Sequence, residues 1–390
     1  MALRHHEVRW QQRVGIWLGI SINPASITLG AGLAARVSLE KLIILIPVGV
    51  ILLTALVLTA GVIGRRHRLP LAGLASRTFG DGSGARVLNL LMAMGMLGWG
   101  GFQVGLAGSS LAGLLGWPLW VGMVITAVSI YTLGSMGVNR WNALVWVTAL
   151  ASLGVAIISL LVSLGQIEPG PALAFGVGDA LWVIGGIIAY ASLFALRCSD
   201  FTWDLASDRD VFIDGLAFAI PLVISLAIGA LLFQAVGSPN IGDVLAETRY
   251  AFLGLVFLVI SLLSPAMSGL HSGSLAMRQV IPISRQKAML LHCGLALLLG
   301  LTRFDYLILP FLEWVGALLP SALVVIILRT AVPLPPHLSR TAWWAGAAAG
   351  AIAKLLGSQA HLAIGAAVAA IVFFIAANAV TVQPDEIQGT

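Results

Sequence analysis

Residues 15–32 read GIWLGISINPASITLGAG, and residues 178–201 read GDALWVIGGIIAYASLFALRCSDF. Each apolar segment carries helix-breaking residues near its middle, Asn23-Pro24 in the first and Gly185-Gly186 in the second. Proline removes a backbone donor, and the residue before it disfavours helical backbone. Irregular backbone at membrane depth persists only where it lines a cavity or is buried in protein. The pattern predicts two interrupted helices around an internal site, although Pro and Gly are also simply common in membrane helices.

The composition of the whole chain indicates a membrane protein. Of its 390 residues, 59% are apolar and only 9% are charged, whereas soluble domains carry about 25% charged residues. A soluble enzyme, a disordered scaffold and a nucleic-acid-binding protein are therefore excluded, and the lipid bilayer is the expected surrounding. The two cysteines, Cys198 and Cys293, give neither a disulfide framework nor a metal-ligand spacing.

Apolar runs near the length that crosses a bilayer, roughly 20 residues, recur along the chain. Divided among about twelve spans, the 390 residues give fewer than 33 for each span together with its loop. No separate soluble domain is therefore expected. We predict an all-α integral membrane protein with about twelve transmembrane helices, near residues 13–34, 41–64, 86–115, 118–136, 141–165, 176–198, 211–236, 250–275, 287–302, 306–329, 341–357 and 361–380.

The basic residues indicate the orientation of these spans. If both termini are cytoplasmic, 16 of the 21 Lys and Arg residues lie on the cytoplasmic side and five on the other. Cytoplasmic loops of membrane proteins carry such an excess of basic residues. We therefore predict a multi-pass protein of the plasma (inner) membrane with both termini in the cytoplasm. Arg197, at the end of the sixth span, counts here as one of the cytoplasmic orientation signals.

The two interrupted helices occupy corresponding places if five helices repeat. One begins a first set over residues 13–165, and the other begins a second set over 176–330. The second set starts from the opposite side of the membrane, so the repeat would be inverted. Paired interrupted helices in two halves point to the midplane site of a secondary transporter. Residues 341–380 would add helices 11 and 12, and residues 1–12 and 381–390 would be cytoplasmic tails.

Several motifs are similar to those of one transporter family. Residues 69–105 read LPLAGLASRTFGDGSGARVLNLLMAMGMLGWGGFQVG, which resembles the second-to-third helix region of the nucleobase–cation symporter-1 family. That family includes cytosine permeases and hydantoin and allantoin transporters. CSDFTWDL at 198–205 resembles the Asp-Phe-Thr motif closing their helix 6, and FLEWVGALLPSALVV at 311–325 resembles their helix 10. The resemblance implies a leucine-transporter-type, five-plus-five inverted repeat with two extra C-terminal helices, and cation-coupled uptake.

The resemblance also implies a substrate site. In relatives a helix 3 Trp stacks on the planar substrate and a Gln one turn later hydrogen-bonds it, and Trp99 and Gln103 match these positions. Residues i and i+4 share a helical face, and an indole with a carboxamide suits a heterocyclic amide. Trp99 as a simple packing residue is the alternative. The expected substrate-binding residues are Trp99, Gln103, Tyr190, Ala191, Gly186, Ser264, Ser268 and Asn23.

Helices 6 and 8 depart from the family pattern. Relatives often carry an aromatic residue where this chain has Ala191, beside Tyr190, and Pro265 stands where helix 8 would supply a second sodium-binding hydroxyl. Sodium needs several hard oxygen ligands, so proton coupling or a weak ion dependence is slightly favoured over sodium coupling. The expected ion-coupling residues are Gly19, Asn23, Ser264, His271 and Glu313.

The titratable candidates have simpler interpretations as well. An ionisable group within the membrane is costly and is a functional candidate by default. His271 could instead reach headgroup water, and Glu313 could pair with a neighbouring donor. Lys354 is expected to extend to the outer surface, since its span ends soon after it.

These features favour a secondary active transporter that imports a nucleobase-like planar heterocycle by alternating access. Cytosine or a purine, hydantoin or allantoin, and a thiamine-precursor pyrimidine are the candidate substrates. We expect a monomer with no cofactor beyond a coupling sodium ion or proton, and no nucleic-acid partner. A transporter of the same fold for an amino acid or another small solute, and a channel-like facilitator without ion coupling, are the alternatives. The spans carry no acidic or His cluster and no nucleotide-binding loop, so neither an enzyme nor a pump is expected.

Overall fold

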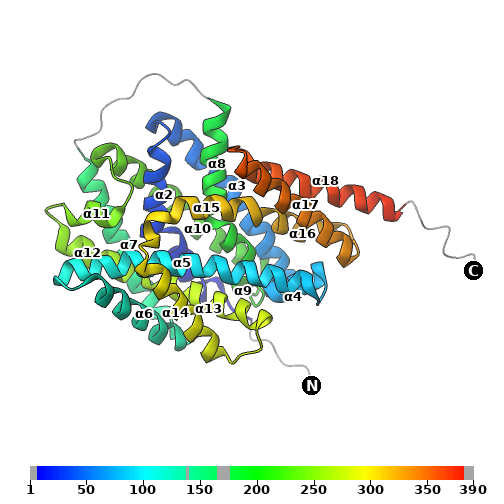
Figure 1. Ribbon diagram of the computed structural model, residues 1–390, viewed down its shortest axis with the longest axis horizontal. Coiled ribbons are helices and arrows are strands. Elements are labelled where there is room, and N and C mark those ends of the chain that lie inside the picture. The colour runs from blue at the N-terminus through cyan, green and yellow to red at the C-terminus, as the bar shows by residue number, and fades with distance from the viewer. Residues whose placement is uncertain (1–6, 138–139, 165–175, 382–390) are drawn as a thin grey trace, which may run out of the picture.

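The computed structural model describes residues 7–137, 140–164 and 176–381 and shows a bundle of helices (Figure 1). The expected tails therefore lie partly outside the described residues. In chain order the helices are η1 (Trp10–Gln12), α1 (Val14–Ser21), α2 (Pro24–Ala34), α3 (Leu39–His67), α4 (Leu71–Phe79), α5 (Ser83–Leu115), α6 (Leu119–Ser135), α7 (Asn142–Ser163), α8 (Val177–Arg197), α9 (Ser199–Thr202), α10 (Asp208–Val236), α11 (Ile241–Ala246), α12 (Ala251–Ser261), α13 (Leu263–Val280), α14 (Arg285–Leu301), η3 (Phe304–Leu307), α15 (Ile308–Leu318), α16 (Pro320–Ala331), α17 (Pro336–Leu355) and α18 (His361–Thr381).

Each of the expected spans coincides with one helix or with two consecutive helices. The pairs are α1 with α2, α12 with α13, and α15 with α16. Within the described residues, nine helical segments are long and apolar enough to cross a membrane, while α6 is apolar but shorter. Large apolar side chains on the outside, such as Ile43, Ile51 and Leu150, are 66–67% exposed, as suits contact with lipid. The chain is a multi-pass helical membrane protein, and twelve crossings stay a prediction.

The interruption of the first span lies where the sequence predicts it. α1 ends at Ser21 and α2 begins at Pro24. Between them Asn23 has extended backbone, and its side chain accepts hydrogen bonds from the N–H groups of Ala25 and Ser26. Pro24 takes the first position of α2, where a missing N–H group removes no helical hydrogen bond. The predicted break at Asn23-Pro24 is confirmed.

The predicted break at Gly185-Gly186 is wrong, because α8 continues through both residues from Val177 to Arg197. A glycine weakens a helix by only about 1 kcal/mol relative to alanine, and tertiary packing readily outweighs that. A Cβ atom at Gly186 would lie 3.3 Å from Leu33 Cδ2, so this glycine allows α2 and α8 to approach. α8 ends at Arg197 and α9 begins at Ser199, but Cys198 between them keeps right-handed helical backbone (φ −58°, ψ −29°), so the chain is not unwound there.

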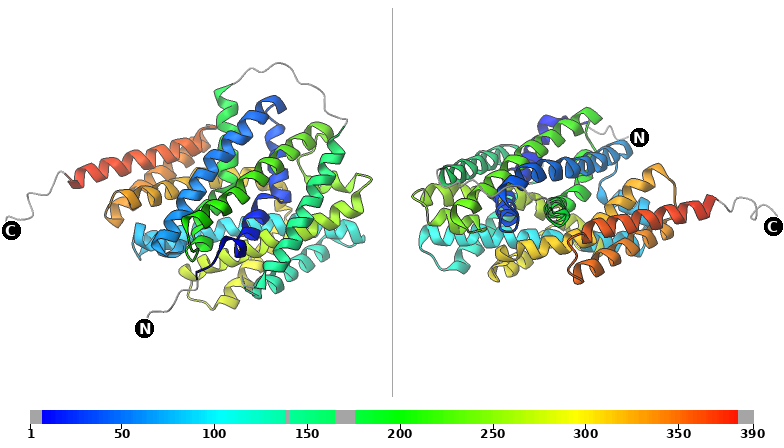
Figure 2. Two further views of the ribbon diagram at one scale, coloured as in Figure 1. Left: turned by 180° about the vertical axis from the view of Figure 1, so that it is seen from behind. Right: turned by 90° about the horizontal axis from the view of Figure 1, so that it is seen from above.

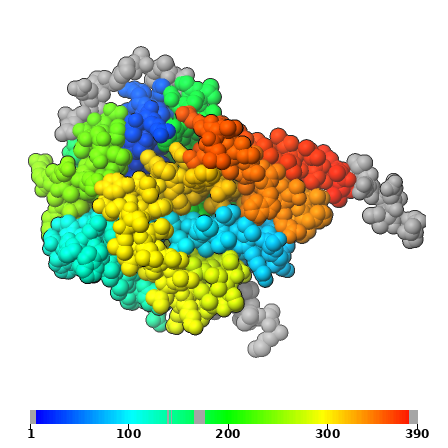
Figure 3. All heavy atoms as spheres, in the orientation of Figure 1, coloured from blue at the N-terminus to red at the C-terminus, as the bar shows by residue number. Residues whose placement is uncertain are grey.

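Helix α5 runs through the middle of the bundle. It packs against α6, α13 and α14, and in Figure 1 it lies across the molecule while α8 stands nearly upright. The last two helices, α17 and α18, pack on each other and on α15 and α16. They form one flank of the molecule, coloured orange to red in Figures 2 and 3. Buried large side chains such as Trp17, Phe102 and Phe218 fill the space between the other helices.

Two glycines bring the backbones of α2 and α10 into direct contact. A Cβ atom at Gly30 would lie 2.1 Å from the carbonyl oxygen of Leu226, and one at Gly229 would lie 1.9 Å from the carbonyl oxygen of Ile27. Both distances are far below van der Waals contact. Small residues permit such close helix packing in membranes. The second half of the interrupted helix is therefore held firmly against α10.

We expect Gly229→Ala to lower the melting temperature of the purified protein, because the added methyl group overpacks the contact by about 1–3 kcal/mol. The matched control is Gly294→Ala on α14, where a Cβ atom would meet no heavy atom within 4 Å. That variant should be neutral or slightly stabilising, since alanine favours helix. Equal melting temperatures for the two variants would contradict the close approach of α2 and α10.

Candidate functional site

A small cavity lies beside the break between α1 and α2. Its volume is about 40 Å³, and its walls come from the break itself and from α5, α8 and α13. Five of the residues expected to bind substrate line it, namely Asn23, Trp99, Gln103, Tyr190 and Ala191. The structure thus brings together residues that are far apart in the sequence. Their role in binding stays a prediction.

Aromatic rings hold Trp99 at the edge of this cavity. Its indole meets the ring of Tyr190 edge to face, with centroids 5.3 Å apart, and it meets Phe102 and Phe311 in the same way at 5.8 and 6.3 Å. Edge-to-face packing of this kind favours one orientation of each ring. The indole is therefore fixed in place between α5, α8 and α15. Such contacts suit a residue that only packs in the core, and they also suit an indole held ready to stack on a ligand.

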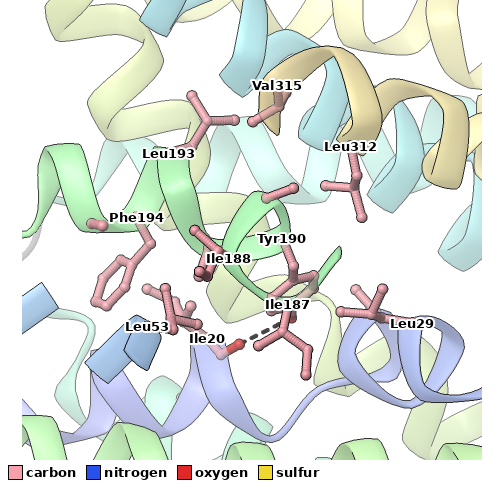
Figure 4. Packing of buried hydrophobic residues seen from close by; sticks show 14 of the residues in the cluster. Ile20, Leu29, Leu53, Ile187, Ile188, Tyr190, Leu193, Phe194, Leu312 and Val315 are labelled. Atoms are coloured by element: carbon pink, nitrogen blue, oxygen red, sulfur yellow. Dashed lines mark hydrogen bonds between the residues drawn. The ribbon is translucent and has the colours of Figure 1, made fainter. Parts of the chain in front are cut away.

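The carbonyl groups at the end of α1 have lost their helical partners at the break, and side chains replace them. Asn23 donates through Nδ2 to the carbonyl oxygens of Gly19 (3.3 Å) and Ile20 (2.5 Å). The hydroxyl of Tyr190 donates to Ile20 as well (3.2 Å) and accepts from Asn23 (3.2 Å). Figure 4 shows the bond from Tyr190 to Ile20. The hydroxyl of Tyr190 therefore supports the interrupted helix.

Gln103 presents an unused hydrogen-bonding atom to the cavity. The residue is only 4% exposed, and its Oε1 atom has no hydrogen-bond partner among the described residues. A buried acceptor left unpaired costs about 1–3 kcal/mol. This position therefore favours a ligand or a water molecule that donates a hydrogen bond.

Arg197 also lines the cavity, so its place among the cytoplasmic orientation signals is wrong. It is 5% exposed, and its guanidinium donates from Nη1 and Nη2 to the carbonyl oxygen (2.8 Å) and hydroxyl (3.1 Å) of Ser268. The rings of Phe194 and Phe201 lie 5.8 and 5.5 Å from it. A count of basic residues treats every arginine at a helix end as exposed. Because α9 follows directly, the end of α8 is buried instead.

The carboxylate that acts on Arg197 from a distance is that of Asp200. It forms no ion pair with Arg197 and accepts a hydrogen bond from the backbone N–H of Leu71 (2.8 Å). Burial raises the pKa of Asp200 to about 6, while the hydrogen bond from Leu71 and the charge of Arg197 oppose that shift. Asp200 is therefore a weak counter-ion for Arg197.

The other predicted residues lie around the cavity rather than in its wall. Ser264 packs against helix 1, since a Cβ atom at Gly19 would lie 2.8 Å from its hydroxyl oxygen. Ser268 binds Arg197, as described above. Gly186 lines a second cavity of about 200 Å³ farther along α8. His271 lies edge-on to Trp141, with ring centroids 5.8 Å apart, and its Nδ1 atom has no partner among the described residues.

Glu313 forms an ion pair with Lys354 in the wall of the second cavity. A carboxylate on α15 thus holds the ammonium group of Lys354, and the expectation that this lysine extends to the outer surface stays a prediction. The sequence allows Glu313 either a role in ion coupling or a pairing with a neighbouring donor, and this ion pair is the second of these.

Asp214 is a buried acid that the sequence analysis missed. It lies on α10 with no exposed surface, and neither of its carboxyl oxygens has a hydrogen-bond partner among the described residues. Asp210 and Arg13 are the charged groups that act on it. An aspartate inside an apolar run is the signal that could have identified it.

An internal cavity beside an interrupted first helix is an arrangement that also occurs in secondary transporters. No protein family's sequence profile matches the chain, and no curated protein is similar to it in sequence. The structure itself is similar to several solved transporters along nearly its whole length.

Mhp1, a nucleobase-cation-symport-1 family transporter, is similar in two conformations. The closed form with bromovinylhydantoin bound has a TM-score of 0.72 at 17% identity, covering 97% of this chain and 93% of Mhp1. The inward-facing form has a TM-score of 0.73 at 16% identity, covering 98% and 94%. MhsT in complex with L-phenylalanine has a TM-score of 0.63 at 17% identity, covering 96% and 100%. The expected resemblance to the nucleobase–cation symporter-1 family is confirmed in the fold.

Proposed function

We propose that this protein is a secondary active transporter that imports a nucleobase-like planar heterocycle across the plasma (inner) membrane by alternating access. The observation that carries this proposal is the meeting of Trp99, Gln103, Tyr190 and Asn23 in one buried cavity at the break of helix 1. The indole of Trp99 offers a face for stacking, and Gln103 offers a donor and an acceptor to the edge of a ring. Mhp1, a transporter of the same fold, binds a hydantoin derivative.

The size of the cavity supports alternating access. A cavity needs about 10–15 Å³ to hold one water molecule, so a cavity of 40 Å³ accommodates only a few water molecules. A planar ring requires more room. Entry and release of a substrate therefore require movement of the surrounding helices or of Trp99 and Tyr190.

We also propose the inverted repeat with twelve crossings, both termini in the cytoplasm, and α17 and α18 as additions to a monomeric transporter. The helix contacts support it. If each helix of residues 13–165 is exchanged with its counterpart in 176–330, the contact of α3 with α8 becomes that of α10 with α1 and α2, and the contact of α5 with α14 becomes that of α13 with α6. All of these contacts exist. A pattern that reproduces itself in this way is expected of two related halves.

For the driving ion we propose a proton rather than sodium. Among the oxygens expected to bind sodium, the carbonyl of Gly19 already accepts a hydrogen bond from Asn23, as does the neighbouring carbonyl of Ile20. Pro265 offers no hydroxyl beside Ser264. Sodium would have to compete with the amide of Asn23 for these carbonyl oxygens. Asp214 and His271 are the proton-carrying candidates, since both have buried, unpartnered polar atoms. A facilitator without ion coupling is the second candidate, and the same occupied oxygens favour it.

We expect Trp99→Ala and Gln103→Ala each to weaken binding of a planar ring. Losing one buried hydrogen bond should reduce affinity roughly 5- to 150-fold for Gln103→Ala. Calorimetric titration of the purified protein with cytosine, hydantoin, allantoin and thiamine-precursor pyrimidines measures this effect. Trp146→Ala is the control, because this tryptophan on α7 is 45% exposed. If both cavity variants bind and transport as the wild type does, the substrate site lies elsewhere.

We expect an inward pH gradient to drive accumulation of the bound ring in proteoliposomes, and a sodium gradient at fixed pH to have little effect. Asp214→Asn should abolish accumulation yet keep exchange of labelled for unlabelled substrate, because exchange requires no net proton movement. Asp243→Asn, a change at an exposed aspartate, is the matched control. Strong stimulation by sodium alone, lost in Ser264→Ala, would overturn proton coupling.

A further inference from the structure

Arg197 places a positive charge in the candidate substrate cavity. Among the described residues that line this cavity, it alone carries a formal charge. It is 5% exposed, so water screens it little. A buried charge without a partner is strongly unfavourable. The charge therefore requires compensation from some group that reaches the cavity.

The protein compensates this charge only in part. A guanidinium has five N–H donors. Ser268 accepts two hydrogen bonds from Arg197, while Nε has no partner among the described residues. The aromatic rings of Phe194 and Phe201 lie near the guanidinium, and such contacts contribute modestly. No described carboxylate lies within ion-pair distance, and Asp200 is held by Leu71.

We propose that the substrate is an anionic planar ring, a heterocyclic carboxylate, whose negative charge pairs with Arg197. This inference rests on the proposed function, because it concerns the same cavity and the same ring. A carboxylate matches the planar fork of a guanidinium and forms the stronger, charge-assisted hydrogen bonds with it. Trp99 would stack on the ring, and the unpaired Oε1 of Gln103 would accept from a ring N–H.

The second cavity adds an independent observation. Arg36 and the Glu313–Lys354 ion pair lie in its wall. The guanidinium of Arg36 lies 4.8 Å from the centre of the Trp182 ring, and no described carboxylate is within ion-pair distance of it. The ion pair is neutral overall, so Arg36, which is exposed, adds a positive charge at the rim of this cavity, and such a charge attracts anions.

The two cavities are neighbours along one helix. Ala189 lines the second cavity, and Tyr190, the next residue of α8, lines the candidate substrate cavity. The two cavities therefore adjoin the same turn of α8, on neighbouring faces of the helix. Arg36 at the one and Arg197 at the other would each attract an anion.

Matched pairs of ligands test this proposal. Uracil and its 6-carboxylate, orotate, share one ring, as do nicotinamide and nicotinate. Calorimetric titration of the purified full chain at pH 7 should show that the carboxylate of at least one pair binds about tenfold or more tightly than its neutral partner. Arg197→Gln should remove this preference by weakening the carboxylate at least tenfold while the neutral ring changes little.

Two further variants separate charge recognition from a purely structural role. Ser268→Ala removes one contact of Arg197 with α13 but keeps the charge, so it should keep the preference for the carboxylate. Arg197→Lys should keep part of it. An arginine that only fastens α8 to α13 would make Arg197→Gln and Ser268→Ala weaken both members of a pair equally, and that result would overturn the proposal.

Ligand binding by the wild type also tests the proposal. Neutral rings that bind as tightly as their carboxylates would overturn the anionic substrate while leaving a heterocycle transporter in place. Absence of binding by every ring, including the neutral heterocycles tested above, in protein that melts cooperatively would contradict the proposed function itself.

Discussion

The side chain of Asn23 holds the interrupted first helix together, and the candidate site depends on it. Its oxygen caps the start of α2, and its amide nitrogen binds the carbonyl groups at the end of α1. Breaking a helix inside a membrane leaves such groups unpaired, and lipid offers them no partner. Tyr190 connects this break to α8 through its hydroxyl and to Trp99 through its ring. Tyr190 thus links the backbone at the break between α1 and α2 to the walls of the cavity.

Arg197 has the corresponding role on the opposite wall. It binds the oxygens of Ser268 on α13, while Asn23 binds those of Gly19 and Ile20 on α1. The carbonyl of Gly19, which is one of the expected sodium ligands, therefore accepts a hydrogen bond from the protein, as does the neighbouring carbonyl of Ile20. The positive charge beside the proposed substrate is then the guanidinium of Arg197 and not a bound sodium ion. This arrangement connects the proposed independence from sodium with the proposed anionic substrate.

The sequence predicted the features that depend on neighbouring residues. Asn23-Pro24 breaks its helix because of local backbone chemistry, and Trp99 and Gln103 share a face because of helical spacing. It failed where distant packing decides. Gly186 stays helical because a glycine costs a packed helix only about 1 kcal/mol, and Arg197 is buried because of α9 and Ser268, which its own segment does not reveal. Asp214 was missed because no local motif surrounds it.

The most direct measurement is the melting temperature of the wild type and of Asn23→Asp in sodium chloride and in choline chloride at equal ionic strength. A bound ion stabilises a protein in proportion to the logarithm of its concentration over Kd. The wild type should melt at the same temperature in both salts, because the amide of Asn23 already satisfies the carbonyls of Gly19 and Ile20. Asn23→Asp replaces that donor with an acceptor and should make the protein more stable in sodium. A wild type that sodium alone stabilises by several degrees would contradict the role given to Asn23.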